Sequence, residues 1–384
     1  VGTEIITRRS AATTDTYSIS IVSATTKISA IANTFTKHQA LQGNKDNNNG
    51  YRGRTVGNVT ATGSYYLSGG SHGGYGGSYS PGSHIPGTTY GSVVEPVELG
   101  SGGGGNTTYQ GGDGGGAIKI VVSGTLTIDG SIESDGVQGN TGQTYHAGGA
   151  GGSVWIDASV LAGSGSVSAE GADANRAPGG GGRVAVYYNS GTFDVSTQVS
   201  AAGGAGSTSG YQGGSGTIYE KPAVLTYGNL YIKGGEVSPN YKSTPIGVFG
   251  TITSISTNTL TVSTGISNSL GNDLVGLSLK PDDDLATVVT VSAHDHSTIS
   301  SASTLNDKTA IGKVFYISDF ENHFDNVVID DKQDVEGGLL IVENDLTVSD
   351  SSGFFVRDVI VNGDTDFGTT SNLIGVNATC LLYT

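Results

Sequence analysis

The sequence predicts an all-β fold: a parallel β-helix, or solenoid, with long glycine-rich loops and a small inserted module of β-barrel or sandwich type. Three observations predict it. A glycine-led unit recurs along the chain, apolar residues alternate with hydroxyl residues inside each unit, and 64 of the 384 residues are glycine, against ~7% in average proteins. The glycines lack the strict G-X-Y period of collagen, which excludes a collagen-like fold.

The repeat unit begins with glycine followed by alternating apolar residues, and successive copies are separated by steps of 36, 30 and 34 residues. Steps of this length are typical of solenoids and repeat arrays. Because one unit cannot bury its apolar face alone, we expect the units to stack in parallel. The competing arrangement is a stack of antiparallel hairpins in two sheets. The residues taken as equivalent are Ile118, Val154, Val184 and Ile218.

Each unit also contains two apolar residues that are six positions apart, such as Leu126 and Ile132, and a glycine soon follows the second of them. Apolar and hydroxyl residues alternate along 125–128, which is the period-2 pattern of a half-buried strand. These apolar positions predict the solenoid core. Its members are Ile118, Ile120, Leu126, Ile132, Val154, Ile156, Leu161, Val167, Val184, Val186, Phe193, Val199 and Ile218.

The long loops between the strands are where glycine is densest, as at residues 102–105 and 179–182. Glycine has two physical uses in such loops: it adopts positive φ at corners, and without a side chain it lets neighbouring segments approach closely. The second use predicts that the loops stack as extended polyglycine layers. The alternative is a set of flexible loops.

Composition divides the chain into four parts. The first is rich in alternating, strand-like stretches, such as Tyr17–Ile21 and Lys27–Ile31, and is a candidate edge-covering or exchanged strand. The third part, residues 247–318, is poor in glycine and has short strand-like runs separated by turn residues. This pattern predicts an inserted β module. The four parts are the N-terminal segment 1–60, the glycine-rich β-helix 61–246, the module 247–318, and resumed rungs with the C-terminal segment at 319–384.

Two stretches, 148–156 and 179–188, carry a resemblance to a known family. They are similar to the glycine-rich parallel β-helix repeats of large secreted bacterial and archaeal surface proteins and adhesins. The most specific positions are Trp155-Ile156 and the run Arg183–Tyr188. The resemblance implies a structural role at the cell surface, and it brings no catalytic residues with it.

Charge and cysteine content exclude several classes of partner. The net charge of −16 would repel phosphate backbones and anionic membranes, so nucleic acid is not an expected partner. No apolar run is long enough to predict a membrane span. The single cysteine, Cys380, cannot form an intrachain disulfide, so stability must come from stacking. The chain contains no Met, and we therefore expect a processed subunit or a segment of a longer protein.

No cofactor is predicted, and two patterns are the candidates for a metal. The run Asp282, Asp283 and Asp284 supplies oxygen ligands of the kind that calcium prefers, although a solvated turn is the favoured interpretation. His294 and His296 would lie on one face of a strand and could hold a transition metal. A third ligand is lacking for that pair, so an exposed loop is favoured.

The chain is not expected to be an enzyme. Polysaccharide-cutting β-helix enzymes use pairs of carboxylates across a groove, for which Glu133, Asp135 and Glu170 are the candidates here. Serine takes the position of Glu133 in the next two units, at Ser168 and Ser200. Glu133 is therefore one side chain on a repeating face.

These observations predict a structural subunit of an extracellular filament, fibre or surface adhesin that polymerises head-to-tail through β-strand contacts. The expected partner is a second copy of the chain, with glycans or other cells as further candidates. The alternative is a carbohydrate-binding or depolymerising β-helix protein of the tailspike type. The residues predicted to form the interface are Tyr17, Ile19, Ile21, Ile28, Ile31, Phe354 and Phe355.

Overall fold

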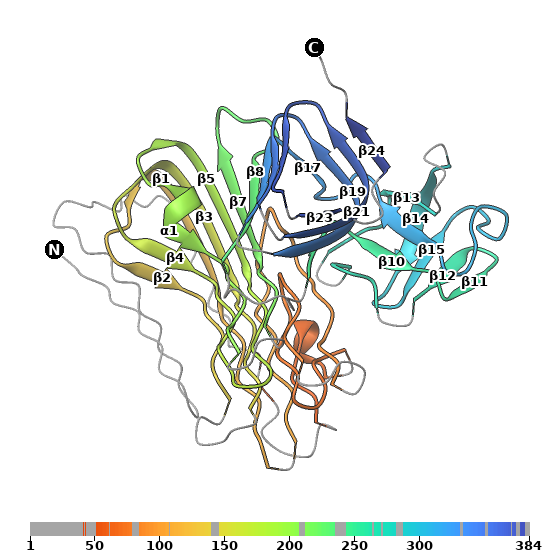
Figure 1. Cartoon of the computed structure of the whole chain (residues 1–384), viewed down its shortest axis with the longest axis horizontal. Helices are drawn as coiled ribbons and strands as arrows, with labels where there is room; N and C mark the ends of the chain where they lie inside the picture. Colours follow the sequence, from red (N-terminus) through yellow and green to blue (C-terminus); the bar gives the residue numbers. More distant parts are fainter. Residues whose placement is uncertain are drawn as a thin grey trace.

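The computed structural model describes residues 41, 43, 51–60, 62–78, 84–106, 108–139, 146–206, 212–234, 243–262, 265–269, 272–281, 287–330, 333–349, 352–369, 371–373 and 377–380. This part of the protein is nearly all β, as predicted (Figure 1). Helix is limited there to the single turn α1 (Val195–Gln198) and the 3-10 turn η2 (Val56–Asn58). In the described chain, no helix is long and apolar enough to cross a membrane.

The repeat forms a stack of parallel strands, which we call the first stack. Its register pairs Ile118 with Val154, Val154 with Val184, and Val184 with Ile218, so the residues taken as equivalent are confirmed. Parallel pairing excludes antiparallel hairpins in this region. The long strands are β1 (Ala117–Thr127), β3 (Ser153–Ala162), β5 (Arg183–Gly191) and β7 (Thr217–Pro222), and the short ones are β2 (Ser131–Glu133), β4 (Ser166–Ser168) and β6 (Val199–Ser200).

One apolar cluster contains buried side chains from both the long and the short strands of the first stack. The predicted core residues lie in this cluster, and Ile118 is the member that is only partly buried and packs against it. Alternation explains the arrangement, because every second side chain of a strand points to the same face. The two parallel sheets thus enclose the core between them.

The glycine-rich loops form a layer of extended, buried segments that lie below the strands in Figure 1. Their backbone hydrogen bonds have a period of three. Gly179 and Gly182 both donate their N–H groups to one segment, residues 169–172. The two glycines between them donate to two other segments, at Gly70 and Gly214. A return to the same neighbour at every third residue is the period of a polyproline II helix.

Glycine allows the backbone segments of this layer to approach one another closely. A Cβ atom on Gly149 would lie 1.9 Å from the carbonyl oxygen of Asp113, and one on Gly182 would lie 2.1 Å from that of Gly152. Neither glycine has φ in the left-handed region. The other predicted use occurs at the corner between β3 and β4, where Gly163 has φ of +115°. The described glycine segments are therefore closely stacked, as the first of the two alternatives predicts.

A second stack begins where the chain turns back after β7. β7 pairs antiparallel with β8, and the following strands are parallel to β8. The eight-stranded sheet is completed by β8 (Asn229–Ile232), β18 (Asn326–Ile329), β20 (Leu346–Val348) and β22 (Thr365–Phe367). The six-stranded sheet consists of β9 (Thr244–Ile246), β17 (His323–Phe324), β19 (Asp334–Val342), β21 (Gly353–Val361), β23 (Asn372–Leu373) and β24 (Asn377–Cys380).

The sequence patterns did not predict the direction of the resumed rungs. They join the sheet of the first stack, but they run opposite to it and enclose a separate apolar cluster. The turn between β7 and β8 is short, with Gly228 at φ of +80°. A short turn can join antiparallel strands, whereas parallel strands need a crossover of a dozen or more residues. The direction of the second stack follows from this turn.

Residues 249–317 form an antiparallel seven-stranded sheet with an apolar cluster of its own, and the sheet lies to one side of the two stacks in Figure 1. The chain enters it after β9 and leaves it before β17, both of which pair with β19. Within the described residues the two edge strands of this sheet, β10 and β11, do not pair with each other, so the sheet is not seen to close into a barrel. Its strands are β10 (Phe249–Thr251), β11 (Ser254–Ser256), β12 (Thr259–Thr261), β13 (Ser278–Lys280), β14 (Val289–His294), β15 (Thr298–Ser301) and β16 (Val314–Ile317).

Candidate functional site

The carboxylates considered for catalysis meet at the exit from the short strands of the first stack. The register of β2 on β4 places Asp135 beside Glu170, its counterpart one repeat later. The backbone N–H of Glu170 donates to Asp135 Oδ1 at 2.7 Å, and Ser168 Oγ donates to Asp135 Oδ2 at 3.0 Å. Ser200 Oγ donates to Glu170 Oε1 at 2.5 Å, which repeats the serine–carboxylate contact one repeat further on.

The surroundings of Asp135 favour its protonated form. Burial raises the pKa of Asp135 to about 6, and the negative charges of Glu170 and Glu133 act in the same direction. The hydrogen bonds from Glu170 N–H and Ser168 oppose this shift. A carboxyl group that holds a proton near pH 6 beside a second carboxylate has the chemistry of an acid–base pair. Serine aligns with Glu133 in the register, as the sequence predicted.

We expect Asp135→Asn to stabilise the protein at pH 7 by about 3 kcal/mol and to leave its stability at pH 3.5 nearly unchanged. The folded-state pKa is raised, so the folded protein holds the Asp135 proton over the window from pH 3.8 to about 6 while the unfolded chain loses it. Stability contributed by this group therefore falls as pH rises through that window. Urea denaturation of both proteins at the two pH values measures the difference. An equal gain at both pH values would contradict the assignment.

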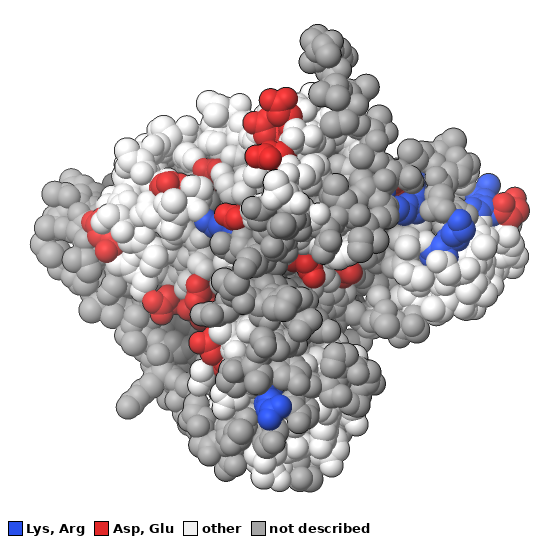
Figure 2. All heavy atoms as spheres, viewed as in Figure 1, with Lys and Arg blue, Asp and Glu red and all other residues white. Residues whose placement is uncertain are grey.

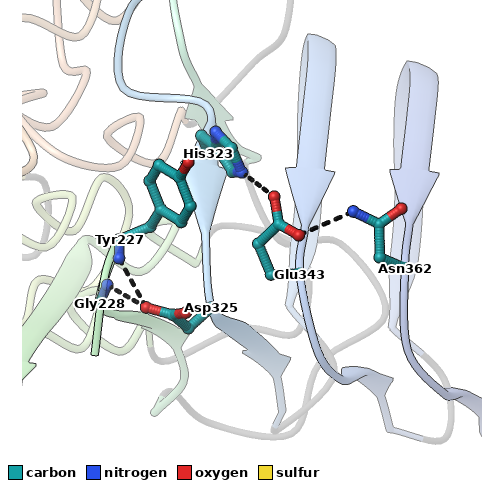
Figure 3. Close-up of polar contacts among 6 residues, drawn as sticks. All are labelled: Tyr227, Gly228, His323, Asp325, Glu343 and Asn362. Carbon is teal, nitrogen blue, oxygen red and sulfur yellow. Dashed lines mark hydrogen bonds and ion pairs between the residues drawn. The ribbon is translucent and has the colours of Figure 1, made fainter. Parts of the chain in front are cut away.

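A second polar row crosses three rungs of the second stack (Figure 3). His323 Nε2 lies 2.5 Å from Glu343 Oε1, and Asn362 Nδ2 donates to Glu343 Oε2 at 2.8 Å. The ring of Tyr227 stacks on the imidazole, with centroids 3.5 Å apart. Glu343 and Asn362 directly follow β19 and β21, and the pairing of Val342 with Val361 places them opposite each other. His323 lies opposite Ile341, so its side chain reaches Glu343 two residues further along the neighbouring segment. Both His323 and Glu343 are about one-third exposed.

The Asn362 amide and His323 together lower the pKa of Glu343. We expect Asn362→Ala to raise the Glu343 pKa toward its ordinary value, because the variant loses the first of these donors. The effect on stability should stay below about 1 kcal/mol, since exposed polar pairs contribute little. Carbon-13 NMR titration of the Glu343 carboxyl measures the shift. A Glu343 pKa that does not move would show that the amide bond is not formed in solution.

Two further carboxylates connect separate parts of the fold. Glu220 accepts hydrogen bonds from Tyr188 Oη at 2.6 Å and from Tyr231 Oη at 2.7 Å, so it joins β5 to β8 across the reversal of strand direction. Asp325 Oδ2 accepts the backbone N–H groups of Tyr227 and Gly228, at 2.6 and 2.7 Å, at the turn into β8 (Figure 3). Glu220 thus links the strands on both sides of β7, and Asp325 fixes the backbone of the turn into β8.

Arg183 is fully buried where the first stack, the loop 84–100 and the inserted module meet. Its guanidinium donates to Tyr90 O at 2.9 Å, to Thr217 Oγ1 at 3.1 Å and to Asn268 Oδ1 at 2.7 Å. Burial lowers the pKa of Arg183 to about 10, so the side chain remains charged at neutral pH. These three acceptors are neutral groups, each from a different part of the chain.

Glu321 is the buried carboxylate of this junction. It accepts a hydrogen bond from Ser92 Oγ and another from the backbone N–H of Val93, the latter at 2.6 Å. Burial raises the pKa of Glu321, while these two bonds and the charge of Arg183 favour its ionised form. The sequence patterns did not mark either residue as part of a site. One feature of the repeat could have marked Arg183. It is in register with Ala117, Ser153 and Thr217, so a large charged residue stands where the other repeats have small ones.

The predicted metal ligands do not form a metal site in the described structure. β14 ends at His294 and β15 begins at Thr298, so His296 lies in the turn, and the prediction of one strand face was wrong. Asp295 causes this turn, because its Oδ1 accepts the N–H groups of Ser297 and Thr298. Asp282, Asp283 and Asp284 lie outside the described residues. Within the described residues no group of three His, Cys, Asp or Glu side chains could hold a metal.

The predicted interface residues divide into two groups. Tyr17, Ile19, Ile21, Ile28 and Ile31 lie outside the described residues. Phe354 is fully buried in the second apolar cluster, with its ring 6.1 Å from that of Phe367. It faces inward because it alternates with the half-buried Phe355 along β21, and its side chain is therefore not available to a neighbouring molecule.

The charged surface has a visible arrangement. In Figure 2 acidic side chains lie mainly over the two stacks, and several basic ones gather on the inserted module. This distribution, with the net charge of −16, leaves the stacks suited to repel polyanions.

Comparison with known proteins finds no matching family model, no similar curated protein and no similar solved structure.

Proposed function

We propose that this protein is a structural subunit of an extracellular filament, fibre or surface adhesin, and that copies join head-to-tail through sheet edges. One observation carries the proposal: β1 and β22 are the two edges of a single eight-stranded sheet, and each has one partner strand among the described residues. The N–H and C=O groups of an edge strand are a template for pairing with another chain. The proposal includes the solenoid architecture, in which each repeat adds one rung.

The reversal between β7 and β8 determines the direction of the proposed contact. β22 runs antiparallel to β1, because the first four strands are parallel to one another and the last four run the opposite way. If successive copies have the same orientation, β22 of one molecule would therefore pair with β1 of the next, and the two strands would be antiparallel. A head-to-tail contact of this kind is heterologous and does not limit the number of subunits unless it closes a ring.

A single substitution tests the edge contact. Leu346 N–H donates to Asp364 O, and Gly368 N–H donates to Val348 O, so the alternation of a parallel ladder points the N–H of Thr365 away from β20. Thr365→Pro removes that outward donor and leaves the ladder intact, whereas Thr365→Val keeps it. Negative-stain microscopy and sedimentation should show assemblies for the parent and for Thr365→Val, and subunits alone for Thr365→Pro. A parent chain that stays monomeric at high concentration would refute the proposal.

A second candidate function is favoured by the adjacency of Asp135 and Glu170. In this alternative the protein binds or depolymerises a polysaccharide, with Asp135 as the acid and Glu170 as the base or nucleophile. Incubation with extracellular polysaccharides, followed by an assay for new reducing ends, tests it. Activity that Glu170→Gln abolishes, while Glu133→Gln preserves it, would favour this function over the structural one.

A further inference from the structure

We propose that Asp364 makes the head-to-tail contact directional, because its carboxylate accepts a backbone N–H group from β1 of the next copy. Asp364 directly precedes β22, the last strand of the eight-stranded sheet. This inference rests on the proposed assembly and adds to it the group that recognises the neighbouring molecule. It follows from a hydrogen bond that recurs between successive rungs of both stacks.

In this recurring contact, an Asp or Asn side chain of one rung accepts the backbone N–H of its counterpart in the next rung. Glu170 N–H donates to Asp135 Oδ1 at 2.7 Å in the first stack, and the strand register places the two residues opposite each other. Asp345 N–H donates to Asn326 Oδ1 at 3.2 Å in the second stack, again between opposite residues. The remaining contacts are Ser164 N–H to Asp129 Oδ1 at 3.4 Å, Ala205 N–H to Asp173 Oδ1 at 2.8 Å, and Asp364 N–H to Asp345 Oδ1 at 3.3 Å.

These contacts share one direction. The acceptor always lies in the earlier rung and the donor in the later rung, although the strands of the two stacks run in opposite directions. The rungs of both stacks follow one another from the β1 edge to the β22 edge of the shared sheet. Each of these rungs therefore presents a side-chain acceptor to the rung after it and an N–H donor to the rung before it.

The two edges of the molecule are complementary in the same way. At the β22 edge, Asp364 is exposed, and its carboxylate has no hydrogen-bond donor among the described residues. At the β1 edge, Ser153 N–H donates to Gly116 O, so ladder alternation directs the N–H groups of Lys119 and Val121 outward. An acceptor at one edge and donors at the other fit a second copy of the chain in the same orientation.

The carboxylate also opposes contact between two β22 edges. Such a contact would bring Asp364 and Asp366 of one molecule close to the same two residues of the other. Both residues are exposed, and like charges across paired strands are destabilising. Charged side chains on an edge strand are one means by which proteins prevent unwanted pairing. Asp364 thus favours an open head-to-tail series over a closed pair of copies.

Substitution of Asp364 tests this role against a matched control. Asp364→Ala removes the acceptor, whereas Asp366→Ala removes the same charge from the same strand. Asp366 suits this purpose because its counterparts, Thr347 and Val328, are neither carboxylates nor amides. We expect Asp364→Ala to raise the concentration at which assemblies form by about tenfold or more, the effect of one charge-assisted hydrogen bond. Asp366→Ala should not raise it, and Asp364→Asn, which keeps an oxygen acceptor, should raise it less than Asp364→Ala.

Sedimentation measures these concentrations and separates the inference from the proposed function. If the parent assembles and Asp364→Ala assembles at the same concentration, the inference fails while the filament proposal stands. If the parent stays monomeric at high concentration, both fail.

A peptide with the sequence of residues 117–127 tests the contact without assembly. It is added to the monomeric protein, and amide hydrogen exchange is followed at Thr365, whose N–H points away from β20. The peptide should slow this exchange in the parent and in Asp366→Ala, and much less in Asp364→Ala. Equal slowing in the parent and in Asp364→Ala would overturn the inference.

Discussion

The Gly149→Ala variant should lose about 3 kcal/mol or more of folding free energy. The added methyl group would lie 1.9 Å from the carbonyl oxygen of Asp113 and 2.3 Å from its carbonyl carbon. These are backbone atoms, and a rotamer change cannot move them away. The neighbouring segment at Asp113 would have to shift, which would break the hydrogen bond from Val137 N–H to Asp113 O.

The matched control is Gly124→Ala. Gly124 lies in β1, is exposed, and has no left-handed φ, and a methyl group added there would meet nothing within 4 Å. The same substitution at this position should be neutral or stabilise by about 0.4–1 kcal/mol, because alanine restricts the unfolded chain. Urea denaturation of both variants measures the contrast. If Gly149→Ala were as stable as Gly124→Ala, close packing would not be the reason for glycine in the layer.

Arg183→Met should cost about 3–5 kcal/mol, the range found when one partner of a buried charged network is removed. The variant leaves Tyr90 O, Thr217 Oγ1 and Asn268 Oδ1 without their donor. It also removes the positive charge that favours ionised Glu321. The loss should appear as a lower urea midpoint with little change in slope, provided that unfolding remains two-state.

A double-variant cycle separates the charge from the hydrogen bonds at this junction. Arg183→Met combined with Glu321→Gln should lose less stability than the sum of the two single variants, because Gln carries no charge that Arg183 would have to balance. Thr217→Val, which removes one acceptor of Arg183, should cost only about 1 kcal/mol. If the stability losses of Arg183→Met and Glu321→Gln simply added in the double variant, Arg183 and Glu321 would not interact.

The candidate sites show how far a single sequence can be interpreted. Asp135 and Glu170 could be predicted as neighbours because the repeat spacing places them one unit apart. The row of His323, Glu343 and Asn362 was missed, since it lies in the second stack, where the repeats lack the glycine-led start. Isolated polar residues there could be paired only after the register of the strands was known.

The sequence by itself determined the all-β class, the equivalence of the repeats and the membership of the first core. These follow from alternation and from a regular step along the chain, which are local properties that survive without knowledge of distant contacts. They are also the features that the parallel register from Ile118 to Ile218 confirmed.

Only the tertiary structure decided the reversal after β7, the inward position of Phe354, and the junction at Arg183. Each depends on which segments meet, and the step length of a repeat carries no information about contacts between different parts of the chain. The glycine layer is intermediate between the two cases. Composition indicated that glycines could pack closely. The threefold pattern of hydrogen bonds, however, forms only when several segments that are distant in the sequence come together. The free energy of association of these segments depends on all of the segments at once.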